Sequence, residues 1–383
     1  MGPGFFPLDE HLCLLASHFS PFLVEGIVRL GAWMPFEQVP AVLQFFTGVH
    51  VTPDTVRRLT ETAGAAQVAI EQRELERIER DLPAIPVGPD RQVVSADGAM
   101  VPLLHGAWTE VRTLALGVLP APTDLPDESA HVHDIRYFSR LCSAHDFTRQ
   151  VTRPCYERGT ARASTVVAVV DGADWLQDLL DAHCPQAVRI LDFPHAAGYV
   201  VDAAKAAFGP GTQEVSAWLA TWLHELKHGQ VDAVLASIRL LAMPSPEAEA
   251  IRTKALAYLT PRRQQMAYAT WQQQGYPIGS GMVESANKLV VEARLKGSGM
   301  HWHANHVTPM LALRGVVCSG AWEAVWPGIW IELRRQGAAR RTQRRLDRQA
   351  TRRAAASASA PTPSDTSRST PPRTRHRSAA AKT

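Results

Sequence analysis

ASTVVAVVDGADWL, residues 163–176, is the stretch that decides the fold which the sequence predicts. Its apolar run Val166–Val170 is continuous and β-branched, which is typical of a strand buried on both faces of a sheet. The run ends at Asp171-Gly172, and a helix is expected at 174–183. A buried strand followed directly by a helix indicates an α/β layer.

Four more stretches complete the expected sheet. They are RQVVSAD (91–97), WTEVRTLALGVL (108–119), IRYFSRL (135–141) and AVRIL (187–191). Asp97 is expected to end the first of them, and Asp192 follows the last. Functional groups gather at the carboxyl ends of strands in open α/β sheets, and a permissive glycine follows both Asp97 and Asp171.

The remainder of the chain has helical periodicity, broken at glycines and prolines. A helix is expected from about Met282 to Lys296, and the tryptophans at 322, 326 and 330 are expected to lie in a core. The predicted organisation has five parts: a helical N-terminal region (1–82), the first part of an α/β core (91–195), an α-helical insertion (196–275), the C-terminal helices of the core (276–333) and a basic tail (334–383).

Near the N-terminus, two short helices flank a tight turn at Thr47–His50. Thr52 can cap the second helix, 53–63, which carries Arg57 and Arg58. This pattern fits a helix-turn-helix, whose second helix enters a DNA major groove. An ordinary helical hairpin fits the same spacing.

The charge of the chain is unevenly distributed. The whole chain has a formal net charge of +3, but residues 334–383 contain fourteen basic and two acidic residues. The other 333 residues therefore contain 26 basic and 35 acidic ones. A basic tail indicates a polyanionic partner, most often nucleic acid, although a merely solvated tail fits as well. The tail can begin as a helix beyond about residue 340, whereas 361–383 has low complexity and is expected to be disordered.

Composition excludes several classes of protein. Hydrophobic residues make up 45% of the 383, enough to bury a core, yet no apolar run approaches the ~20 residues of a membrane span. The first residues lack the basic and apolar regions of a secretory signal. The five cysteines are scattered without a CxxC pair, which argues against disulfides or a zinc knuckle and favours a reducing, cytoplasmic location.

Three acids are candidates for a metal site: Asp97, Asp171 and Glu284. Glu284 lies in the first turn of the 282–296 helix, directly after a Gly-Ser-Gly bend. Carboxylates are the hard oxygen ligands that Mg²⁺ prefers, and two such ions can promote phosphoryl transfer. Each acid taken alone also has a structural explanation, because Asp-Gly is a common turn and Glu favours helix starts.

A longer pattern points to a family. The segment YPIGSGMVESANKLVVEARLKGSGMHWHANHVTPMLALRGVVCSGAWEAVW (276–326) closely resembles the C-terminal signature of ISKra-type insertion-sequence transposases, relatives of the Mutator-like DDE group. VVAVVDGADWL (166–176) resembles the family's second-acid motif, and ILDFPHAAGYV (190–200) its Asp-x-x-His motif. VVSADGAMV (93–101) looks like its first-acid strand. The similarity extends over most of the chain.

The resemblance implies a ribonuclease H-like catalytic core interrupted by an all-α insertion, with Asp97, Asp171 and Glu284 binding two Mg²⁺ or Mn²⁺ ions. It points to Asp192 and His195 as an auxiliary pair, which orients DNA, supports the metal ligands, or is a buried pair that holds the insertion. The implied activity is DDE transposition: cleavage at the ends of an insertion sequence and strand transfer into target DNA. The implied partner is double-stranded DNA, and the implied assembly is a homo-oligomer. No membrane contact is expected, and the expected location is the cytoplasm, in association with the nucleoid.

Several cations are candidate DNA contacts. Lys288, Arg294 and Lys296 follow Glu284 on its helix, and Lys288 shares its face because it is four residues on. A cation there could hold a phosphate beside the metals, or it could be a solvated charge. The family often has Arg and Ser around the tryptophan where this chain has His301-Trp302-His303, which leaves that local DNA contact open.

Two other functions remain possible at this stage. The chain could be a catalytically inactive DNA-binding protein derived from a transposase. It could also be a zinc metalloprotease, because His224, Glu225 and His228 fit the HExxH pattern. Lys227 within that pattern, Gly229 directly after it and the lack of a clear third-ligand motif argue against the protease.

Overall fold

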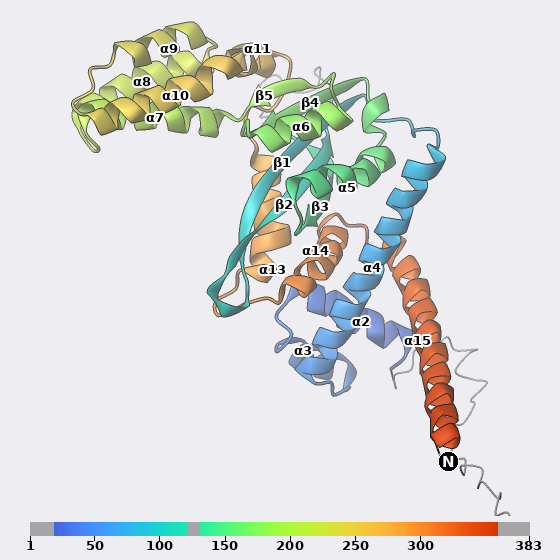
Figure 1. Ribbon diagram of the computed structural model, residues 1–383. Helices are drawn as coiled ribbons and strands as arrows, with labels where there is room; N and C mark the ends of the chain where they lie inside the picture. The colour runs from blue at the N-terminus through green and yellow to red at the C-terminus, as the bar shows by residue number, and fades with distance from the viewer. Residues whose placement is uncertain (1–18, 122–130, 359–383) are drawn as a thin grey trace, which may run out of the picture. The chain divides into compact units, whose positions relative to one another are not determined.

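The computed structural model describes residues 19–121 and 131–358 (Figure 1). The chain divides into two compact units, Met1–Arg334 and Arg335–Thr383. The sheet of the first unit contains β1 (Arg91–Pro102), β2 (Trp108–Val118), β3 (His133–Arg140), β4 (Thr165–Val170) and β5 (Val188–Leu191). The predicted α/β class is therefore confirmed.

The sheet is mixed, with the strand order β3-β2-β1-β4-β5. β1 and β2 pair antiparallel, as do β2 and β3, whereas β4 is parallel to both β1 and β5. The prediction that the first strand ends at Asp97 is wrong. β1 pairs with β4 only as far as Val94, but it stays paired with β2 as far as Pro102–Trp108. Because β3 pairs with β2 only as far as Arg112, β1 and β2 form a two-stranded ribbon from Ala99 onward. Asp97 thus lies near the middle of β1, three residues beyond the last residue that pairs with β4.

Helices cover both faces of the sheet (Figure 1). Side chains alternate between the faces of a strand. Val94 and Ala96 of β1 therefore pack with α5 (Ala144–Glu157) and α6 (Asp174–His183). The opposite face, which includes Ala99 and Val101, packs against the helical segment formed by α12 (Gly281–Ala286), the π-helix η5 (Asn287–Glu292) and α13 (Ala293–Leu295). Asp97 belongs to this second face.

The predicted insertion is all helical. It contains α7 (Phe193–Phe208), α8 (Gln213–Lys227), α9 (Val231–Leu240), α10 (Pro246–Leu259), the 3-10 helix η4 (Thr260–Met266) and α11 (Tyr268–Gln273). Its apolar side chains form one continuous core with the strands, because Val200, Leu235 and Leu259 cluster with Val169 of β4 and Leu191 of β5. The insertion is thereby anchored beside the carboxyl ends of the parallel strands.

From residue 19 onward, three helices precede the sheet: α2 (Pro21–Trp33), α3 (Val39–Thr47) and α4 (Pro53–Asp81). Gly48 has φ 70°, which forms the tight turn after α3, and the Thr52 hydroxyl accepts a hydrogen bond from the Thr55 N–H at the start of α4. α4 continues without a break well beyond the helix expected at 53–63, as far as Asp81. It crosses α14 (Ala304–Cys318) at Gly64, where a Cβ would lie 2.2 Å from the Pro309 carbonyl oxygen.

α15 (Trp322–Ala358) begins in the first unit and continues into the second. Trp322 and Trp326 are buried with their rings stacked 5.2 Å apart, so the prediction that these tryptophans belong to a core is confirmed. The tail is helical as far as Ala358, and the disorder expected for 361–383 falls outside the described residues. Within the described ranges, no helix combines the length and apolar character needed to cross a bilayer.

Candidate functional site

Asp97 of β1 and Asp171, the residue directly after β4, lie level with each other. Val94 pairs with Ala168, and each aspartate is the third residue after its member of that pair. Adjacent strands are about 4.8 Å apart, and residues in register point to the same face. The two carboxyl groups are therefore neighbours on the face that α12 and η5 cover.

The surroundings of Asp97 oppose its charge. Burial raises the pKa of Asp97 above its ordinary value, and the Asp171 carboxylate adds to that rise. Two hydrogen bonds favour the charged form: the Gly98 N–H donates to Oδ1 at 2.7 Å, and the Asn287 side-chain amide donates to Oδ2 at 3.0 Å. The other polar atom of that amide, Oδ1 of Asn287, is buried and has no hydrogen-bond partner among the described residues. The oxygen atoms of Asp97, Asp171 and Asn287 at this point are the kind of ligand that a divalent cation prefers.

The loop after β4 is held by the insertion. Tyr258 of α10 donates a hydrogen bond from its hydroxyl to the Asp171 carbonyl oxygen, and Arg262 of η4 donates to the Gly172 carbonyl oxygen at 2.7 Å. The Arg262 guanidinium also lies 4.1 Å from the centre of the Tyr258 ring. Gly172 has φ 82°, and a Cβ there would lie 2.7 Å from Arg262 Nε. Sequence reasoning missed both contacts, because they join residues 87 and 90 positions apart.

Glu284 lies on α12, over the same face of the sheet. It precedes Asn287 by three residues, or about one helical turn, and Asn287 contacts Asp97. Its side chain is exposed, and it accepts a hydrogen bond from the Ser280 hydroxyl at 3.3 Å. In this conformation, no group of three or more His, Cys, Asp or Glu residues within 19–121 and 131–358 is placed to hold a metal ion. The structure thus brings the two aspartates together. Glu284 lies nearby, but its carboxylate is hydrogen-bonded to Ser280 in the Gly-Ser-Gly bend.

Asp192 joins three parts of this site. It is buried, with 4% of its surface exposed, and its backbone N–H donates to the Val170 carbonyl at the end of β4. Its Oδ1 accepts from the Ser280 N–H at 2.7 Å, and its Oδ2 accepts from the His195 N–H at 2.9 Å as the N-cap of α7. Both oxygens are thus engaged by backbone groups, which fastens the Gly-Ser-Gly bend before Glu284 to the end of β4.

The ring of His195 makes a separate set of contacts. Its centroid lies 5.8 Å from that of Tyr199 and 5.9 Å from that of Tyr258. Asp192 therefore bonds to the backbone of His195 rather than to its ring. The pair links the start of the insertion to the tyrosine that holds the Asp171 loop.

The candidate DNA-contacting cations differ in their availability. Arg58 and Lys288 are exposed. Arg57 forms ion pairs with Asp54 at 2.6 Å and Glu61 at 3.1 Å. Lys296 forms an ion pair with Glu292, with 2.7 Å between Nζ and Oε1. The paired cations would have to exchange a carboxylate for a phosphate on binding DNA.

Arg294 requires a correction. Only 1% of its surface is exposed, its Nε donates to the Gly31 carbonyl oxygen at 3.1 Å, and its guanidinium lies 4.5 Å from the Phe36 ring centre and 5.2 Å from that of Trp302. Burial lowers its pKa to about 10. A side chain enclosed in this way does not face DNA; Arg294 instead fastens α13 to the C-terminal end of α2.

The HExxH residues lie at a helix end. α8 ends at Lys227, so His228 is the C-cap and its Nδ1 hydrogen-bonds with the His224 carbonyl oxygen at 2.8 Å. Both rings are exposed, 4.0 Å apart between centroids. In the zinc-binding form of this pattern both histidines lie on one intact helical turn, whereas here the second histidine lies just past the end of the helix.

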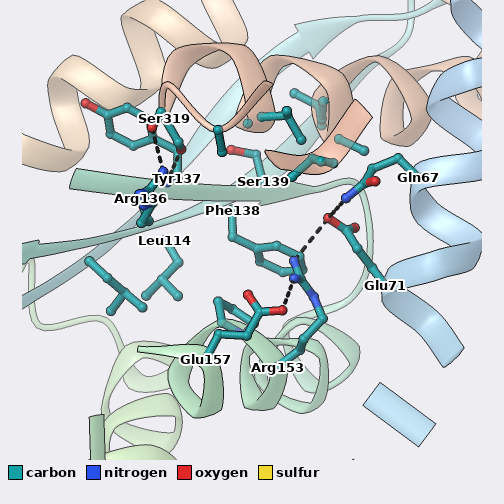
Figure 2. A pocket seen from close by; sticks show the side chains of 18 of the residues that line it. Gln67, Glu71, Leu114, Arg136, Tyr137, Phe138, Ser139, Arg153, Glu157 and Ser319 are labelled. Atoms are coloured by element: carbon teal, nitrogen blue, oxygen red, sulfur yellow. Dashed lines mark hydrogen bonds and ion pairs between the residues drawn. The ribbon is translucent and has the colours of Figure 1, made fainter. Parts of the chain in front are cut away.

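A cavity of about 370 Å³ lies at the outer edge of β3, and none of the candidate acids lines it (Figure 2). Glu71 of α4 accepts hydrogen bonds from Gln67 at 2.9 Å and from Arg153 of α5 at 3.0 Å. The Tyr137 N–H, on the free side of β3, donates to the Ser319 hydroxyl at 3.0 Å. Arg140 of β3 also donates to Glu71, so these contacts cover the sheet edge and join it to α4 and, through Arg153, to α5.

Comparison of the chain with models of known protein families and with curated proteins finds no match.

Proposed function

We propose that the chain is a DDE-type DNA transposase that cleaves the ends of an insertion sequence and joins them to target DNA in a metal-dependent reaction. The observation that carries this proposal is the level placement of Asp97 on β1 and Asp171 directly after the parallel strand β4, under the helix that bears Glu284. The mixed sheet is compatible with a ribonuclease H-like core, and the helical insertion follows β5.

In this proposal, Asp97, Asp171 and Glu284 would hold two Mg²⁺ or Mn²⁺ ions, whose chemistry would be to activate an attacking oxygen and to neutralise charge at the scissile phosphate. The chain's own residues hold the ligands in place. Asn287 orients the Asp97 carboxylate, and Tyr258 and Arg262 fix the backbone that carries Asp171. Glu284 joins the two aspartates when its side chain leaves Ser280.

DNA recognition belongs, in the same proposal, to the helix-turn-helix formed by α3 and the start of α4. Arg57 and Arg58 lie on the first turns of α4, where a recognition helix meets base edges and phosphates. Lys288, exposed one turn after Glu284, would meet a phosphate near the metals. Two ends of an element must be held together, so a homo-oligomer acting in the nucleoid follows from this function.

The test is cleavage of a labelled duplex that carries the DNA flanking the chain's own gene, in Mg²⁺ or Mn²⁺. The wild-type chain should produce 3′-hydroxyl ends, and Asp171→Asn should lower the rate at least ~100-fold while duplex binding is retained, since even supporting residues of metal sites contribute ~10–100-fold. Cleavage that survives in Asp171→Asn would contradict the proposed site.

A second candidate is a DNA-binding protein without catalysis. The hydrogen bond between Glu284 and Ser280, which leaves only two acids together, favours it. The same assay separates the two functions: folded wild-type protein that binds the duplex and cuts it with neither metal supports the second candidate.

A further inference from the structure

The second unit contains a basic helical surface that the proposed site does not include. We name residues 335–358, the C-terminal part of α15, the basic arm. Every residue from Ala338 to Arg352 is exposed. Six arginines fall within this stretch, at positions 340, 341, 344, 345, 348 and 352.

The six arginines share one face of the helix. At about 100° per residue, they fall within an arc of about 140°. Asp347, the one acid among residues 338–352, falls outside that arc and accepts a hydrogen bond from Gln343 at 2.8 Å. The arginines therefore form a stripe, which we call the arginine face, rather than a charge spread evenly around the helix.

The arginine face weakens the helix when it is unpaired. Arg340, Arg344, Arg348 and Arg352 follow one another at four-residue spacing, and each such like-charged pair destabilises a helix by ~0.2–0.5 kcal/mol. No residue between Ala338 and Arg352 is buried, so no packing energy offsets this repulsion. A polyanion laid along the face would remove the repulsion and stabilise the helix.

The dimensions and chemistry of the face favour a DNA duplex. Residues 340–352 span about 18 Å, which is about five base pairs. Guanidinium groups bind phosphates with two parallel hydrogen bonds, and a major groove admits an α-helix. A membrane surface fits poorly, because helices that lie on bilayers have an apolar face, and Leu346 is the only large apolar residue from 338 to 352.

We propose that the basic arm binds double-stranded DNA through its arginine face, and that binding fixes the arm as a helix. The contact adds affinity without base readout, because its groups match phosphates. It does not depend on the cleavage activity proposed above.

The first test asks whether DNA affinity depends on the position of the arginines or only on the net charge of the arm. Full-length chain is titrated with a labelled duplex of about 20 base pairs over a range of salt concentrations, by fluorescence anisotropy. Arg344→Gln/Arg348→Gln removes two charges from the face. A matched variant adds Gln343→Arg and Gln349→Arg to these two changes, which restores the composition and charge but moves both charges outside the arc.

Both variants should bind at least tenfold more weakly than the wild type at about 0.1 M salt. The slope of log affinity against log salt should fall by about 1.8, which is about 0.9 for each lost phosphate contact. The proposal is overturned if the matched variant binds like the wild type, since net charge alone would then explain binding. Tighter binding to duplex RNA or to phosphatidylserine vesicles than to DNA would also overturn it.

The second test asks whether DNA orders the arm. Amide hydrogen exchange of residues 338–352 in the full chain should slow when the duplex is added, and by the same factor in Asp171→Asn. Because that variant removes a proposed catalytic acid, protection in it supports the arm even if no cleavage is ever found. Unchanged exchange in the presence of saturating duplex would contradict the proposal.

Discussion

Asp97 combines a chemical role with a cost to stability. Burial and the neighbouring Asp171 charge raise its pKa, so the folded chain binds a proton there more readily than the unfolded chain. Its contribution to stability is therefore most favourable at low pH. It is lost as pH rises from the ordinary pKa of Asp through the raised one.

Asp97→Asn should accordingly stabilise the metal-free protein at pH 7 and abolish cleavage. The side-chain oxygen of the new amide keeps the hydrogen bond from the Gly98 N–H. If the side-chain amide of Asn287 flips, its unpartnered Oδ1 can accept a hydrogen bond from the new amide. Urea denaturation in EDTA measures the effect, and the gain should shrink below pH 4. Asp202→Asn, on an exposed helical face, is the control and should change neither quantity.

A loss of stability in Asp97→Asn at pH 7 would show that the charged form is favoured in the fold, against the raised pKa. Added Mg²⁺ gives an independent reading. It should stabilise the wild type more than the variant, because a ligand that binds only the folded state raises its stability. Equal stabilisation of the two proteins would remove Asp97 from the metal site.

Among the elements, α7 and the bend before α12 are connected by a single side chain. Asp192 caps α7 and also holds the Ser280 N–H. Asp192→Ala should lose the cap, worth ~1 kcal/mol, and should also release the bend. Hydrogen exchange at 277–283 should then accelerate, and cleavage, if the proposed function holds, should lose kcat with little change in DNA affinity.

Thr212→Ala is the matched control for this prediction. Thr212 caps α8 of the same insertion through the Val215 N–H but contacts no part of the site. The two variants should lose comparable stability from their caps, and only Asp192→Ala should mobilise 277–283. Equal exchange at 277–283 in both would mean that Asp192 is merely a helix cap.

The elements themselves were largely accessible to sequence reasoning. Apolar runs, alternating patterns and breaks at Gly and Pro are local signals, and they located the five strands of the described sheet and the helical insertion. The end of β1 was mispredicted because the pairing partner, and not the strand's own residues, determines how far a ribbon extends. Tyr258 and Arg262 were missed because their contacts with the Asp171 loop depend on how the insertion folds back. Asn287, three residues after Glu284, was within reach of helical spacing.

At the scale of the first unit, two buried arginines join the N-terminal helices to the helical segment that bears Glu284. Arg314 of α14 donates to the carbonyl oxygens of Ala32, Leu289 and Val290, and 1% of its surface is exposed. Arg294 is equally buried but donates to the Gly31 carbonyl alone, and its Nη2 has no partner among the described residues. Burial lowers the pKa of both guanidinium groups.

These two arginines should therefore respond differently to the same substitution. Arg314→Met removes three hydrogen bonds from a buried side chain to carbonyl oxygens, which should lower the free energy of unfolding by roughly 3 kcal/mol. Arg294→Met leaves one carbonyl unpaired but removes a poorly satisfied buried charge, so the two effects should nearly cancel. Urea denaturation of both variants measures the difference. Equal losses would mean that burial of the guanidinium, rather than its hydrogen bonds, determines how firmly the N-terminal helices are attached.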